Sequence, residues 1–204
     1  MKTLIASLLL ITPVLSHAAV IYSGLQNIPL TTSFGGVFID LDNAATSGSA
    51  FTGWDINPFY GGSGIANSPD FQAARTGTGN VDAIIRLNFG DLVGGGLNYS
   101  TGFGGSGSPN AHLGGGANQF GVGTEGYLGF KFTLNDTSGP YYGWMRVTLT
   151  NNTAGGVISD WAYDDTGSAL TIAGVPEPGR IGLILLGLLG LVTRRRRAIK
   201  VSFA

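Results

Sequence analysis

Apolar and polar residues alternate with a period of two along most of the chain between residues 19 and 174. The clearest stretch is Gly126–Leu134, in which Lys131 lies opposite a face of four apolar residues. These four are Leu128, Phe130, Phe132 and Leu134. A period of two is the spacing of a strand with one buried face, and no stretch of ten residues shows the spacing of an amphipathic helix. The pattern predicts an all-β body in which the apolar face of this strand is buried and Lys131 is exposed.

Turn-forming residues divide the pattern into eight predicted strands. They are Ala19–Gly24, Gly36–Leu41, Phe51–Ile56, Val81–Phe89, Gly126–Leu134, Tyr142–Thr150, Val157–Tyr163 and Ala169–Ile172. The connection at residues 151–156 is rich in Asn and Gly, which favours an antiparallel hairpin. The sequence therefore predicts a single antiparallel β-sandwich, jelly-roll-like in form, over residues 19–174. The glycine-rich segment Gly90–Gly123 is predicted to be a long loop.

Composition and charge limit the kinds of partner that the body can have. A chain of 204 residues is long enough for one domain with a hydrophobic core, and only 11% of the residues are charged. Eleven acidic and four basic residues between Val20 and Ala173 give the body a net charge of −7. Nucleic-acid binding needs clustered cations, so no nucleic-acid partner is expected. The chain has no cysteine, which removes disulfides, thiolate metal sites and thiol nucleophiles.

The N-terminus has the three parts of a secretory signal peptide. Lys2 supplies a positive charge, residues 4–15 form an apolar run, and small residues surround the junction of Ala18 and Ala19. The run is too short to serve as a membrane-spanning helix. We predict export through the Sec translocon and cleavage by signal peptidase after Ala18 or one residue later, so that residues 1–18 form the signal peptide.

The C-terminus combines a proline-rich motif, an apolar run and a block of cations. In chain order these are Pro176, Glu177 and Pro178, the run Ile181–Val192, and Arg194, Arg195, Arg196 and Arg197. As a helix, this run together with Thr193 would be about 20 Å long, which is shorter than the roughly 30 Å hydrocarbon core of a bilayer. Snorkelling arginine side chains and local thinning of the bilayer can cover the difference. The arginine block orients this predicted transmembrane helix with the body outside the cytoplasmic membrane.

This order of parts resembles the PEP-CTERM sorting signal, the bacterial tail that is processed by exosortase. The resemblance covers residues 175–204, and residues 198–204 extend slightly beyond the usual pattern. It implies that exosortase, a membrane transpeptidase, cuts near Pro176–Pro178 after an inner-membrane stage and leaves the body at the cell surface or in the extracellular matrix. Residues 126–178 also resemble the closing portion of many such substrates, which implies an exported β-sandwich and nothing about catalysis.

Asp40 and Asp42 are the first candidates for a metal site. They lie two residues apart, and therefore on one face, at the end of a predicted strand, and Asp55 belongs to the next predicted strand. Their hard carboxylate oxygens suit Ca²⁺. Ala44 and Ala45 stand where a calcium-binding loop would place further ligands and its turn glycine. The favoured interpretation is therefore solvated acids without a cofactor, and Ca²⁺ is the alternative.

The sequence predicts no catalytic constellation. His112 is the only histidine outside the signal peptide, and it lies among glycines without a neighbouring serine and aspartate. Glu125 is the only glutamate of the body, so no carboxylate pair for glycoside hydrolysis stands out. Five aromatic residues would offer flat rings to sugars if they lay on an outer face, although such residues are more often core or cross-strand pairs. They are Trp54, Tyr60, Trp144, Trp161 and Tyr163. We therefore predict a non-enzymatic surface or matrix protein, with extracellular polysaccharide as a candidate partner. The alternatives are a secreted carbohydrate-binding module and, third, a secreted polysaccharide hydrolase.

Overall fold

The protein, as described by a computed structural model, is built from strands. The model describes residues 20–59, 64–79, 82–100, 120, 123–134, 138–151, 155–167 and 171–175. In these ranges the chain forms fourteen strands, and every pairing between them is antiparallel. The predicted all-β class is confirmed. The predicted signal peptide and tail helix lie outside these ranges, and within them no helix is long and apolar enough to cross a bilayer.

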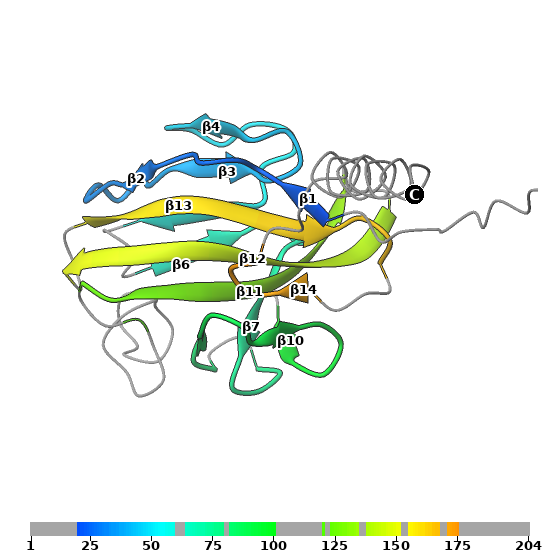
Figure 1. Cartoon of the computed structure of the whole chain (residues 1–204). Coiled ribbons are helices and arrows are strands. Elements are labelled where there is room, and N and C mark those ends of the chain that lie inside the picture. Colours follow the sequence, from blue (N-terminus) through cyan, green and yellow to red (C-terminus); the bar gives the residue numbers. More distant parts are fainter. Residues whose placement is uncertain are drawn as a thin grey trace, which may run out of the picture.

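The larger sheet has eight strands. Six of them follow the order β1 (Val20–Tyr22), β13 (Gly155–Asp164), β12 (Ser138–Asn151), β11 (Glu125–Leu134), β7 (Gln72–Arg75) and β10 (Asn98–Ser100). β2 (Ile28–Leu30) also pairs with β13, and β8 (Arg86–Leu87) also pairs with β11. The three long strands β11, β12 and β13 run side by side through the centre of the molecule (Figure 1).

The smaller sheet has four strands, in the order β4 (Ala45–Ser47), β3 (Phe38–Asp40), β5 (Ile56–Phe59) and β6 (Gly64–Asn67). One buried cluster joins the two sheets, because it contains Ile39 and Ile56 from the smaller sheet and Phe130 and Trp161 from the larger sheet. Burial of such side chains from both sheets supplies the main driving force for folding. Two antiparallel sheets that share one core are consistent with the predicted β-sandwich.

The outer face of the larger sheet is covered in part by a two-stranded ribbon. β9 (Leu92–Val93) pairs with β14 (Thr171–Ile172), and β14 lies against β12 (Figure 1). Val93 and Ala173 pack with Tyr127 and Trp144 in a second buried cluster. The central strands are therefore buried on both faces over part of their length.

The predicted burial of the apolar face of β11 is confirmed for three of its four residues, and the fourth is partly buried. Leu128, Phe130 and Phe132 are fully buried, and Leu134 is half-buried against the same cluster. The prediction for Lys131 is wrong, because this side chain is half-buried, with its Nζ 5.4 Å from the centre of the Tyr99 ring. The reason is that β7 and β10 extend the sheet beside β11 and bring Tyr99 next to the lysine.

Several predicted strand boundaries are also wrong. The strand predicted at Phe51–Ile56 starts only at Ile56, because the chain turns through Gly53, whose φ of +87° interrupts an extended strand. Of the strand predicted at Val81–Phe89, β8 retains two residues, and Ile84 forms an isolated bridge. The segment Gly90–Gly123 is not wholly a loop, since β9 and β10 lie within it. Residues 101–119 of that segment lie outside the described ranges.

Candidate functional site

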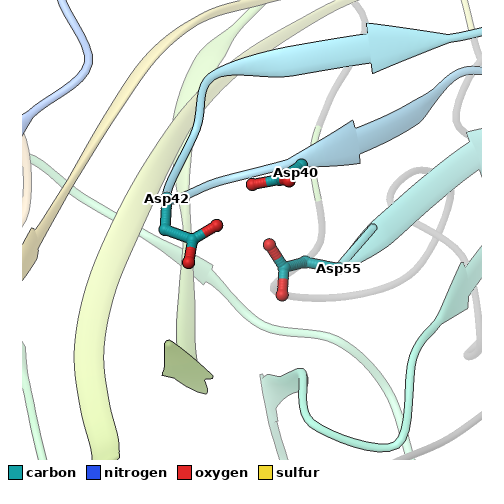
Figure 2. A group of neighbouring side chains, drawn as sticks. All are labelled: Asp40, Asp42 and Asp55. Carbon is teal, nitrogen blue, oxygen red and sulfur yellow. The ribbon is translucent and has the colours of Figure 1, made fainter. Parts of the chain in front are cut away.

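Three carboxylates meet at one end of the smaller sheet. Asp40 is the last residue of β3, Asp42 lies in the turn that follows, and Asp55 directly precedes β5. One oxygen from each carboxylate lies within 4.8 Å of the others, as the converging side chains in Figure 2 show. Asp40 and Asp55 are only 3% and 5% exposed, whereas Asp42 is half-buried. The structure thus brings together the three aspartates that the sequence singled out.

The local chain path explains why these side chains converge. β3 and β4 form a hairpin in which Asp40 is paired with Ala45, so the four residues between them make a tight turn. Asn43 supports this turn, since its backbone N donates to Asp40 Oδ1 at 2.9 Å and its Nδ2 donates to Asp42 Oδ1 at 3.1 Å. Asp55 is held against the same turn, because its Oδ2 accepts a hydrogen bond from the backbone N of Leu41 at 2.7 Å.

The surroundings of the cluster are strongly negative. Burial opposes ionisation of Asp40, but its hydrogen bonds with Asp42 and Asn43 outweigh burial and hold its pKa below the ordinary value. The same negative charges affect Tyr163, which lies in β13 of the larger sheet. Burial, followed by the charges of Asp42, Asp165, Asp55 and Asp40, raises the pKa of Tyr163 to about 12. A cation at the cluster would therefore meet a favourable potential.

The spacing of the oxygens fits one calcium ion. Ca²⁺ binds oxygen ligands at about 2.3–2.6 Å, so two oxygens on the same ion can be separated by at most roughly 5 Å. Three carboxylates supply fewer than the six to eight oxygens that Ca²⁺ takes, and the remainder would have to come from backbone carbonyls or water. The carbonyl oxygen of Leu41 already accepts a hydrogen bond from Trp161 Nε1 at 3.0 Å.

Comparisons of the chain with protein-family models, with curated proteins and with solved structures found no match.

The sugar-stacking candidates do not form a platform on an outer face of the larger sheet. Tyr163 is buried, Trp54 is half-buried and Tyr60 lies outside the described ranges. Trp144 and Trp161 are 1% and 0% exposed, because the two faces of the larger sheet are covered by the main core and by the β9–β14 ribbon. Neither ring can therefore contact a polysaccharide at the surface.

The remaining predicted residues lie outside the described ranges or serve the fold. Asp164 Oδ1 accepts hydrogen bonds from the backbone N and Oγ1 of Thr166, both at 2.6 Å, and so supports the turn after β13. His112 lies outside the described ranges, and so do all the predicted processing and sorting residues. These processing and sorting residues are Ala18, Ala19, Pro176, Glu177, Pro178, Arg194, Arg195, Arg196 and Arg197.

Sequence reasoning missed a buried ionic network in the larger sheet. Asp160 is 2% exposed and accepts hydrogen bonds from Arg146 Nε at 2.9 Å and from the hydroxyl of Tyr22 at 2.7 Å. Arg146 also lies 3.7 Å from Glu125 Oε2. The network connects β1, β11, β12 and β13, so its role is to hold the sheet together. The signal in the sequence was a charge on each of two adjacent strands, but the register that pairs Arg146 with Asp160 cannot be deduced from spacing alone.

Proposed function

We propose that this protein is an exported, non-enzymatic surface or extracellular-matrix protein whose jelly-roll-like body is processed at a C-terminal sorting signal by exosortase. The observation that carries the proposal is the order of the tail, in which Pro176–Pro178 precede the apolar run Ile181–Val192 and the block Arg194–Arg197. The two prolines favour an extended backbone that a protease can bind, and the arginines retain the run at the inner membrane.

The ends of the described body support both cleavage steps. β1 begins at Val20, which is paired with Asp164 of β13, so cleavage after Ala18 or Ala19 would leave this strand intact. At the other end, the backbone N of Ala173 donates to Asp91 O at 2.9 Å, and its O accepts from Gly90 N at 3.0 Å. Pro176 follows three residues later, so a cut at the motif would leave the β9–β14 pairing in place.

The chemistry of the acidic cluster supports a non-enzymatic role. Glycoside hydrolysis needs one carboxyl that stays protonated beside a second that is ionised. The pKa of Asp40 is lowered rather than raised. Asp40 therefore lacks the environment of a general acid, so it gives the hydrolase alternative no support.

The sorting proposal is tested by the intact mass of the mature protein from cells with and without exosortase. With active exosortase we expect the mass of a body that ends near Pro176–Pro178, and without it a membrane-bound precursor that retains the tail. Pro176→Ala with Pro178→Ala should accumulate the uncut precursor, because the run stays apolar while the extended site is lost. Replacement of Arg194–Arg197 by glutamine should instead release the chain from the membrane uncut. A full-length membrane protein in cells with active exosortase would refute the proposal.

The spacing of Asp40, Asp42 and Asp55 favours a second function, the binding of Ca²⁺ as a structural ion. An ion that binds only the folded state at a hundred times its Kd stabilises that state by about 2.7 kcal/mol, which for a domain of this size raises Tm by roughly 5–10 °C. We expect such a rise on changing from EDTA to millimolar Ca²⁺. Asp42→Asn should remove most of it, while Asp70→Asn, at a half-buried acid outside the cluster, should leave it unchanged. Equal Tm values in EDTA and Ca²⁺ would exclude this site.

A further inference from the structure

The outer face of the smaller sheet carries a hollow with aromatic walls. It has a volume of about 380 Å³ and is lined by Phe38 of β3, Phe59 of β5 and Phe34 from the loop before β3. The Phe34 ring is 69% exposed and packs edge-on against Phe59, with 5.8 Å between ring centres. Phe38 in turn packs edge-on against Trp54 at 4.9 Å. An exposed phenyl ring that is braced by a buried one forms a rigid apolar wall that a ligand can contact.

A second hollow, of about 500 Å³, lies between β2 and β4, and five of its eleven lining residues are uncharged polar residues. Those with hydroxyl or amide side chains are Gln26, Asn27, Thr31, Thr46 and Ser47. Gly48 lines both hollows, so they meet at the end of β4.

Two residues that line the second hollow, Asn27 and Ala44, have positive φ angles of 52° and 51°. They are the two non-glycine residues of the described ranges with positive φ. Backbone in this sparsely populated region is found preferentially at functional sites.

The lining of the two hollows has no charge. None of the residues that line either one is an aspartate, glutamate, lysine, arginine or histidine. The body around them has a net charge of −7 between Val20 and Ala173. An anionic polymer would therefore be repelled on approach and would find no cation on arrival. A ligand that matches these hollows must be neutral, must have apolar faces for the aromatic wall, and must have many hydroxyl groups for the polar side.

We propose that these two hollows, joined at Gly48, form a binding site for a neutral polysaccharide. The C–H faces of a sugar ring would rest on Phe34, and the ring hydroxyls would bond to the amides and hydroxyls beside β4. This inference deepens the proposed function, since a matrix protein would then hold a neutral matrix polymer. It places binding on the outer face of the smaller sheet and at its junction with β2 of the larger sheet, away from the buried tryptophans.

The test is affinity electrophoresis of the full chain after signal removal, purified in detergent, through gels that contain dextran, galactomannan or xyloglucan. Gels with alginate or polygalacturonate serve as the anionic counterpart. We expect at least one neutral polymer to retard the protein and the anionic polymers to have no effect. Because purified protein is used, failure here would leave the exosortase proposal standing, and failure of processing would leave this result unaffected.

Two pairs of variants locate the site. Phe34→Ala should weaken binding at least tenfold, whereas Phe89→Ala, at a ring of matched exposure (68%), should change it less than twofold. Gly48→Leu should weaken binding, because it adds a bulky side chain at the residue that lines both hollows. An added Cβ there meets no atom within 4 Å, so the fold should tolerate the change. Gly96→Leu, at a glycine with equally open surroundings between β9 and β10, is its control.

The proposal is overturned by any of three results. These are no retardation by any of the three neutral polymers, stronger retardation by the anionic polymers, or unchanged binding in both Phe34→Ala and Gly48→Leu. Thermal unfolding of each variant separates loss of binding from loss of fold, since Phe34→Ala also removes an edge-on contact with the buried Phe59 ring.

Discussion

Truncation of Phe130 tests whether the two sheets share one core. The ring is fully buried, and it packs against Phe71 at 5.3 Å and Phe132 at 5.6 Å between ring centres. Its Cζ also lies over Gly143 of β12, where an added Cβ would be only 2.6 Å away. A buried phenylalanine side chain removes roughly 150–250 Å² from water, which at about 25 cal/mol per Å² corresponds to around 4–6 kcal/mol, an upper estimate.

We expect Phe130→Ala to lower the free energy of unfolding by about 3–5 kcal/mol, the range found for such truncations. The upper part of this range applies because the strands on either side are held by ladder hydrogen bonds and cannot collapse into the cavity. For a domain of this size the change lowers Tm by roughly 6–20 °C. Urea unfolding followed by the fluorescence of the buried tryptophans measures it. Phe34→Ala is the matched control on the surface, with an expected loss below about 1 kcal/mol. Equal losses in the two variants would refute the assigned core.

Two further predictions concern the polar groups of the larger sheet. Arg146→Ala should lower the free energy of unfolding by about 1–3 kcal/mol, because it leaves the buried carboxylate of Asp160 with the Tyr22 hydroxyl but without its cation. Asp160→Asn in the same chain should recover part of that loss. Strictly additive losses in this double-mutant cycle would argue against the ion pair. Burial and then Tyr142 raise the pKa of Tyr99 above its ordinary value of 10, so the folded state holds this proton more tightly than the unfolded chain does. The contribution of this pKa difference to the free energy of unfolding is fully present below about pH 10 and is lost as pH rises further. Between pH 9 and pH 11 the free energy of unfolding should therefore fall more in wild type than in Tyr99→Phe. Parallel curves for the two proteins would contradict this.

The long strands were predictable because their sequences repeat the alternation over many residues. In β11 apolar residues recur at every second position from Leu128 to Leu134, and turn residues delimit β12 and β13 clearly. β4, β9 and β10 could not be found in this way, because a strand of two or three residues has no period to detect. β9 and β14 form a pair although they are far apart in the sequence, and such pairing depends on how the rest of the chain has already folded.

The acidic cluster was partly predictable. The sequence places Asp40 and Asp42 close together at a predicted strand end, but Asp42 lies in the turn after β3, so the turn and not strand alternation sets its position. The approach of Asp55 depends on the pairing of Ile39 with Ile56, which brings the residue before β5 to the end of β3. That register follows from burial of both isoleucines in the core, so it requires knowing which sheet they belong to.

The aromatic residues show most clearly where sequence reasoning stops. Strand alternation places Trp144 on the face opposite Met145, but it cannot tell whether a second layer covers that face, as the β9–β14 ribbon does. Phe34, which has an exposed ring, comes from a loop without any periodic pattern. Its position depends on the close approach of Gly36 to β5, where a Cβ would collide with Asn57 and lie 2.5 Å from the backbone O of Pro58. A glycine at that one position lets the loop fold down onto the smaller sheet and form the wall of the hollow. The candidate ligand site is thus determined by a steric constraint in the folded chain, which is the kind of information that hydrophobic periodicity does not contain.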